Sequence, residues 1–193
     1  IHLIRAALTA VMAYLFFFGL TRVPLAQAIG LSFIAPIITL FLAVPVLGER
    51  IGANAKLAAV LGFGGVMVVV GGELLAVDEG SDAVGMAAVL ISAVMYAFNL
   101  VLQRMQALVA RPLEIAFYQN TIVFLMMLVG VPFAVSWPAS SYQWGGAALA
   151  AGFAVGSLML MSLAYRQAEA QRLVVIEYTA FIWAAILGWW FFA

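Results

Sequence analysis

Two charged residues lie inside long apolar stretches of this sequence, where they could act on a bound solute. Glu177 follows an apolar run that begins at Leu173, and Arg5 lies one helical turn into another. An ionisable side chain at mid-bilayer costs about 2.5 to 3.5 kcal/mol on insertion scales, so one kept there predicts a function. We expect Glu177 to be a proton or cation partner, or else to reach back to Arg172 or Arg166. Arg5 is a candidate anion contact, or else its guanidinium extends to the lipid headgroups.

Polar side chains at helical spacing predict a solute path beside these charges. Ser92, Tyr96, Asn99 and Gln103 recur at steps of four, three and four residues, which places them on one helix face. Such a face lines an aqueous cavity or makes hydrogen bonds between helices. The residues expected to line the path are Ser32, Tyr96, Asn99, Tyr118, Asn120, Glu177, Tyr178 and Trp183.

A proline and several small residues also lie within the apolar stretches. Pro36 removes a backbone donor and frees a carbonyl, so its turn either lines a cavity or permits bending. Ala58 with Gly62, and Gly152 with Gly156, have the four-residue spacing that lets helices approach closely. We expect both pairs to lie at helix contacts.

The sequence lacks the residues that other kinds of site require. It has no cysteine and one histidine, His2, which excludes disulfides, thiol nucleophiles and histidine clusters for metals. Neither HExxH nor GxSxG is present, which argues against an enzyme. Lys56, the one lysine, lies outside the last apolar stretch, where a retinal-binding photoreceptor would need it. We expect no enzyme activity, no metal and no cofactor.

The composition excludes a water-soluble fold. The chain has 193 residues, of which 67% are hydrophobic and 8% charged, and its mean hydropathy is +1.19. An ordinary soluble domain is about 25% charged, so most of this surface must face lipid. The formal net charge is zero, which leaves no basic field to attract nucleic acid.

Seven apolar stretches are long enough to cross a bilayer as helices, which takes about 20 residues each. They are residues 3–20, 24–47, 53–71, 85–102, 113–135, 146–165 and 173–192. The sequence thus predicts an all-α polytopic membrane protein with seven helices. The longest polar gap, residues 73–84, is acidic and separates three helices from four.

The positions of the cations predict the orientation of these helices. If residue 1 is cytoplasmic, seven of the eight cations lie at cytoplasmic ends, and only Arg22 lies outside. Lys and Arg in short loops stay on the cytoplasmic side. Trp137, Tyr142 and Trp144 then share an outer segment, as interfacial aromatic residues do. We expect a cell membrane, the inner membrane of a bacterium, with residues 73–84 outside.

Two segments of the sequence resemble each other. They are residues 19–28 and 164–173. Pairing Arg22 with Arg166 gives an offset of 166 − 22 = 144 residues, and pairing Ala35 with Ala180 gives 180 − 35 = 145. This offset spans five predicted helices, and an odd number of helices inverts the second copy in the membrane. The parent would be a ten-helix bundle of two inverted repeats. Residues 1–72 would be the last three helices of the first repeat, 73–84 the outer loop, and 85–193 the first four helices of the second.

Four motifs resemble the EamA-type family of the drug/metabolite transporter superfamily. They are the runs at 20–28 and 31–36, Leu47-Gly-Glu-Arg50, and the run at 176–183 that starts Ile-Glu-Tyr-Thr. The resemblance covers the whole chain and implies two inverted five-helix repeats with a substrate path between them. It also implies small metabolites or amino acids as cargo, often exported. The second Gly-Glu of the family would follow Ala193.

We therefore expect a transporter, exporter or exchanger, of small organic metabolites such as amino acids. Its partners would be the solute and the lipid bilayer, with proton coupling and a homodimer left open. A channel is the alternative, although the absence of a charged ring and the internal repeat favour alternating access.

Overall fold

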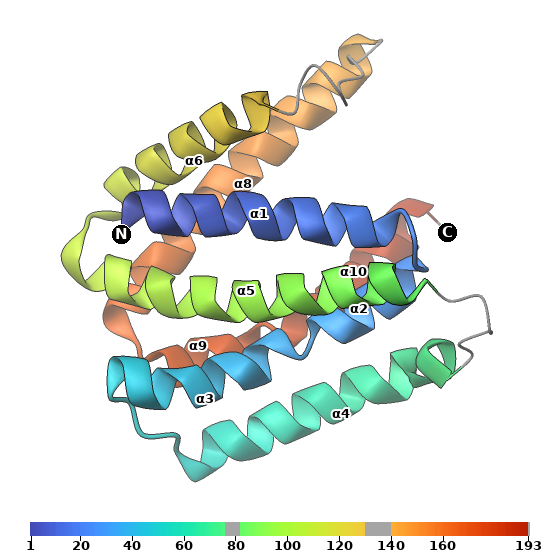
Figure 1. Cartoon of the computed structure of the whole chain (residues 1–193), viewed down its shortest axis with the longest axis horizontal. Helices are drawn as coiled ribbons and strands as arrows, with labels where there is room; N and C mark the ends of the chain where they lie inside the picture. The colour runs from blue at the N-terminus through green and yellow to red at the C-terminus, as the bar shows by residue number, and fades with distance from the viewer. Residues whose placement is uncertain (76–81, 130–139, 193) are drawn as a thin grey trace.

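The computed structural model describes residues 1–75, 82–129 and 140–192, and every regular element in these ranges is an α-helix (Figure 1). In chain order the helices are α1 (His2–Leu20), α2 (Leu25–Ser32), α3 (Ala35–Leu47), α4 (Ala53–Leu75), α5 (Ala83–Val109), α6 (Pro112–Leu128), α8 (Ser141–Gln167), α9 (Ala170–Ile176) and α10 (Thr179–Phe192). The predicted all-helical class is confirmed. By length and composition, four spans in the described residues suit a membrane crossing, namely α1, residues 27–47, α5 and α8.

Two of the predicted helices are broken in the middle, which corrects the expectation of seven uninterrupted helices. Residues 24–47 form α2 and α3 with a turn at Phe33-Ile34, and residues 173–192 form most of α9 and all of α10 with a turn at Glu177-Tyr178. The first break has a local cause, because Pro36 in the first turn of α3 has no N–H to bond the carbonyl four residues earlier. The second break has no proline, and no local feature of the sequence predicts it.

Several helix ends also differ from the predicted ones. α4 continues to Leu75, so the segment predicted as an outer loop at 73–84 begins inside a helix. α5 is seven residues longer than predicted at its C-terminal end, and α8 begins at Ser141 within the predicted outer segment. Tyr142 and Trp144 lie exposed in the first turn of α8. Trp137 and residues 130–135 of the fifth predicted helix lie outside the described residues.

The long helix α5 is the centre of the bundle. It packs along α1 and α3 and also contacts α2, α8, α6 and α9, and Figure 1 shows it running between α1 and α3. Close approach to α1 depends on small residues. A Cβ atom added at Gly19 would lie 2.4 Å from a methyl carbon of Val89, and one at Gly85 would lie 2.7 Å from Cβ of Arg22.

The small-residue pairs predicted for helix contacts have different surroundings. Gly62 on α4 lies against the ring of Tyr178, so close contact occurs there. Gly152 and Gly156 on α8 have no described neighbour within 4 Å of the position that a Cβ would take. In the described part of the chain, the α8 pair is therefore not a helix contact.

The first and last three helices repeat one arrangement in opposite directions. α2 and α9 start 170 − 25 = 145 residues apart, and α3 and α10 start 179 − 35 = 144 residues apart. Figure 1 shows α1 and α8 crossing the bundle in opposite directions, as do α2–α3 and α9–α10. The offsets match those read from the sequence repeat.

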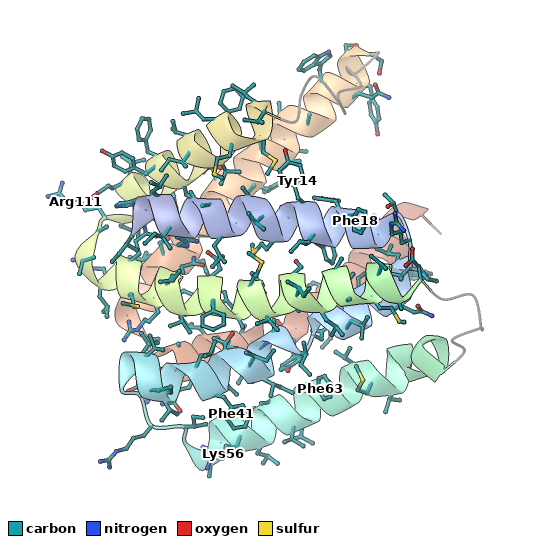
Figure 2. All side chains as sticks on the ribbon, in the orientation of Figure 1. Tyr14, Phe18, Phe41, Lys56, Phe63 and Arg111 are labelled. Atoms are coloured by element: carbon teal, nitrogen blue, oxygen red, sulfur yellow. The ribbon has the colours of Figure 1, made fainter. Side chains whose placement is uncertain are left out.

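Cations gather where the chain begins and where α3, α5 and α8 end. We call this the basic end, defined by Arg50, Lys56, Arg111, Arg166 and Arg172, and Figure 2 shows Arg111 and Lys56 toward it and Phe18 toward the opposite end. At the opposite end Arg22 Nη1 lies 2.6 Å from Asp82 Oδ2. Asp82 also caps α5 by accepting hydrogen bonds from the N–H groups of Val84 and Gly85. The bond from Arg22, and then the capping bonds, lower the pKa of Asp82 below its usual value.

The contact of α1 with α5 generates a stability prediction. We expect Gly19→Ala to lower the free energy of unfolding by about 1 to 3 kcal/mol, because the new methyl group meets a stiff valine and the carbonyl oxygen of Gly85. Gly64→Ala is the matched control, because nothing lies within 4 Å of its Cβ position and alanine favours a helix. Unfolding in detergent measures both, and equal losses for the two variants would contradict the predicted clash.

Candidate functional site

A cavity of about 1240 Å³ lies between the first three helices, α5 and the last three helices. Its wall is mostly apolar, with aromatic side chains of Phe16, Phe33 and Trp183. The polar side chains on this wall are Arg5, Ser32, Tyr96, Asn99, Gln103, Ser157, Glu177 and Thr179. An apolar pocket with a few convergent polar groups is the usual form of a small-molecule site.

The structure brings most of the predicted path residues to this one cavity. Five of the eight line it: Ser32, Tyr96, Asn99, Glu177 and Trp183, together with the candidate anion contact Arg5. Three lie elsewhere. Tyr118 on α6 is half-exposed with its ring centroid 4.8 Å from that of His2, and Asn120 donates to Ala116 O on its own helix at 2.8 Å. Tyr178 is buried on the far side of the α9–α10 turn.

Arg5 is held inside the bundle by neutral partners. Its side chain donates from Nε to Asn99 Oδ1 at 3.1 Å and from Nη1 to Gln106 Oε1 at 2.9 Å, and the residue is 2% exposed. The guanidinium therefore points to α5 and not to the lipid headgroups. No carboxylate of the described residues forms an ion pair with it. A buried charge with amide partners alone attracts an electron-rich ligand group.

Glu177 lies in the turn between α9 and α10 and faces the same cavity. Its Oε2 accepts a hydrogen bond from the Tyr96 hydroxyl at 3.3 Å, and its Oε1 is buried with no partner among the described residues. Arg172, one of the alternatives for pairing, lies 4.0 Å from Glu169 instead. A carboxylate with a free oxygen at a helix break can accept a proton or a donor group of a ligand.

The polar face predicted on α5 has two uses. Ser92 donates to the backbone oxygen of Met12 at 2.8 Å and so joins α5 to α1. Tyr96, Asn99 and Gln103 line the cavity. Both interpretations of this face are therefore present, at different depths along one helix.

Two residues of the network around Arg5, Gln106 and Thr9, were missed by sequence reasoning. Gln106 continues the polar face of α5 three residues beyond Gln103, so extending the same spacing would have found it. Thr9 is less obvious, because it accepts from Gln119 of α6 at 2.8 Å and donates to the backbone oxygen of Arg5. The bond from Gln119 joins residues 110 positions apart, and no local pattern marks it.

The described residues contain no cluster of three or more histidine, cysteine, aspartate or glutamate side chains that could hold a metal ion. The cavity wall itself offers hydrogen-bonding groups, two charges and aromatic surface.

Comparison with known proteins identifies transporters as relatives. Residues 1–71 match the EamA-like transporter family, which confirms the resemblance seen in the motifs. The chain is 31% identical over 185 residues to the riboflavin transporter of Rhizobium johnstonii (strain DSM 114642 / LMG 32736 / 3841), covering 93% of this chain and 53% of that protein. The chain thus spans about half the length of this curated relative.

A solved crystal structure has the same fold. The two chains superpose with a TM-score of 0.77 at 21% sequence identity, over 97% of this chain and 65% of the other. At that identity the likeness shows the fold alone.

The network around Arg5 generates a second stability prediction. We expect Asn99→Ala to lower the free energy of unfolding by about 1 to 3 kcal/mol, because a buried charged donor loses its acceptor. Asn120→Ala is the matched control, because Asn120 is exposed and its amide bonds only its own helix. Unfolding of both variants in the same detergent measures the difference, and a loss at Asn120 as large as at Asn99 would contradict the role of the network.

Proposed function

From this likeness to EamA-like transporters, we propose that the chain is part of a membrane transporter that carries a small organic solute through the large cavity. The observation that carries the proposal is the pair Arg5 and Glu177. Both lie on one cavity in a lipid-facing bundle, and neither has an oppositely charged partner among the described residues. Such charges are costly, and a ligand that meets them would lower that cost.

The broken helices support transport in preference to a static binding role. Discontinuous helices in oppositely oriented repeats, with the solute site at the breaks, are the usual architecture of secondary transporters. Here one break contributes Phe33 to the cavity wall and the other contributes Glu177. The basic end would be cytoplasmic by the distribution of cations, which places residues 73–84 on the outer side of a cell membrane.

We propose a planar, mainly apolar solute with polar edges as the cargo, and riboflavin is the first compound to test. The relative with 31% identity is named a riboflavin transporter. Phe16, Phe33 and Trp183 offer aromatic surface to a flat ring system. Arg5 offers donors to carbonyl oxygens, and Glu177 offers an acceptor to N–H or hydroxyl groups. Amino acids, which carry both charges on a smaller body, are the second class.

The proposed cargo can be tested on the whole protein that contains this chain. Riboflavin at 100 times its dissociation constant should stabilise the folded protein by about 2.7 kcal/mol, as measured by unfolding in detergent. It should also cross the membrane of proteoliposomes. Amino acids and nucleosides serve as the comparison set. If only an amino acid stabilises the protein and crosses the membrane, riboflavin is not the cargo. If ions are conducted and no solute crosses, the protein is a channel and not a transporter.

We also propose that Glu177 couples transport to protons. Glu177→Gln keeps an acceptor for the Tyr96 hydroxyl but cannot bind a proton, so solute flux should lose its response to an imposed pH gradient. Glu114→Gln is the matched control, because Glu114 on α6 pairs with His2 at 3.4 Å outside the cavity and should keep the response. Flux measured at several pH values decides this. The same response in wild type and Glu177→Gln would remove Glu177 from the coupling step.

A further inference from the structure

Two contacts join the last three helices to the first three, and they lie at different depths in the bundle. One is centred on Glu49 at the basic end. The other joins the two helix breaks beside the cavity. Their different relation to the repeat gives them different tasks during transport.

The contact at the basic end is a carboxylate clasp, formed by Glu49, Arg104, Ala170 and Gln171. Glu49 follows α3, and its side-chain oxygens accept from the N–H groups of Ala170 at 3.0 Å and Gln171 at 3.3 Å, at the start of α9. Arg104 of α5 donates to Glu49 Oε1 at 3.3 Å and also to the backbone oxygen of Tyr165 on α8. Gln171 Oε1 in turn accepts from the N–H of Gly52 at 2.8 Å.

A smaller cavity of about 480 Å³ lies at the clasp, at the basic end. The smaller cavity is lined by Glu49, Arg104 and Gln171, with Arg50 and Glu169. Gln103, which precedes Arg104 on α5, lines the large cavity, and so does Leu173, two residues after Gln171 on α9. Ala170 of the clasp belongs to a layer of fully buried side chains that also includes Tyr165 and Val174. A solute in the large cavity would meet this layer and the clasp before it reached the basic end.

The second contact joins the two helix breaks to each other. The Tyr178 hydroxyl donates to the backbone oxygen of Phe33 at 3.2 Å, and the two rings stack with centroids 5.8 Å apart and planes 18° from parallel. Gly62 of α4 makes room for the Tyr178 ring, since a Cβ there would lie 2.6 Å from it. Phe33 and Tyr178 are 178 − 33 = 145 residues apart, so they are equivalent in the repeat to within one residue.

The repeat predicts that one of these contacts persists during transport and that the other breaks. In a transporter built of inverted repeats, the two access states arise when the repeats exchange conformations about their pseudo-two-fold axis. A contact between equivalent segments lies at that axis and is its own counterpart, so the exchange preserves it. The Glu49 clasp joins non-equivalent segments, the end of α3 and the start of α9, so the exchange breaks it.

We propose that the Glu49 clasp is the gate that closes the cavity toward the basic end, and that Phe33 and Tyr178 form the pivot that stays closed in both states. This inference rests on the proposed transport function. Glu49 acts as a gating residue and Tyr178 as a positioning residue that holds Glu177 at the cavity. Neither needs to touch the solute.

Cross-linking distinguishes gate from pivot in the whole protein. The chain described here has no cysteine, so introduced pairs can be joined selectively once any cysteine outside this chain has been replaced by serine. The gate pair is Gly52→Cys with Gln171→Cys, since a Cβ at Gly52 would lie 3.8 Å from Gln171 Oε1. The pivot pair is Phe33→Cys with Tyr178→Cys. Each pair is joined with a short bis-methanethiosulfonate, which forms a disulfide with each cysteine and releases methanesulfinate. Solute flux is measured before joining, after joining and after reduction.

Joining the gate pair should stop flux, and reduction should restore it. Joining the pivot pair should leave the flux of that same double variant unchanged. Flux that continues through the joined gate, or stops at the joined pivot, would overturn the assignment. If the unmodified protein binds and moves no solute at all, the failure belongs to the proposed function and not to the gate.

A charge substitution tests the gate without cross-linking. Glu49→Gln should speed labelling of an Ala164→Cys reporter by a membrane-impermeant thiol reagent from the basic end by about tenfold, since a lost charge-assisted bond shifts a two-state equilibrium by that order. Ala164 lines the large cavity. Glu169→Gln is the matched control, because the carboxylate of Glu169 contacts the side chains of Gln171 and Arg172 in the described residues and makes no bond there to Ala170 or Arg104. Equal labelling rates in Glu49→Gln, Glu169→Gln and the reporter alone, with all three proteins folded, would contradict the assignment of the clasp as a gate.

Discussion

A bilayer offers no hydrogen-bond partners, so each polar group within this bundle must find its partner on the protein itself. α5 supplies most of these hydrogen-bond partners. Its polar face bonds the backbone of α1 through Ser92, holds Arg5 through Asn99 and Gln106, and holds Glu49 through Arg104. The helix that contacts the most neighbours is also the one that supplies their polar partners. Packing and polar satisfaction therefore depend on the same element.

The two helix breaks have the greatest local need for hydrogen-bond donors, because each leaves backbone carbonyls outside the regular helical pattern. The Tyr178 hydroxyl donates to the backbone oxygen of Phe33 from across the bundle. The Thr179 hydroxyl donates to the backbone oxygen of Ile176 beside its own break. Ser32 and Thr39 bond carbonyls one turn earlier on either side of the first break. The breaks are tolerated because they face each other and a cavity, not lipid.

The proposed function rests on the polar groups that lack a matching partner. One oxygen of Glu177 has no partner among the described residues, and the guanidinium of Arg5 has amides where a carboxylate would serve better. At the basic end the carboxylate of Glu49 caps α9 and pairs with Arg104. In the proposed function, a ligand would meet the groups in the cavity, while the clasp would hold the helices together.

The sequence by itself determined the solvent, the helical class, the basic end, the repeat offset and the polar face of α5. Composition and short-range spacing carry all of these, so no tertiary contact is needed to read them. The tertiary structure decided that Tyr118 and Asn120 lie outside the cavity, that Tyr178 packs behind a break without a proline, and that Glu49 caps a helix 121 residues away. These outcomes depend on how the helices are rotated about their axes and packed against one another. A contact with a residue far along the chain leaves no periodic pattern in the local sequence.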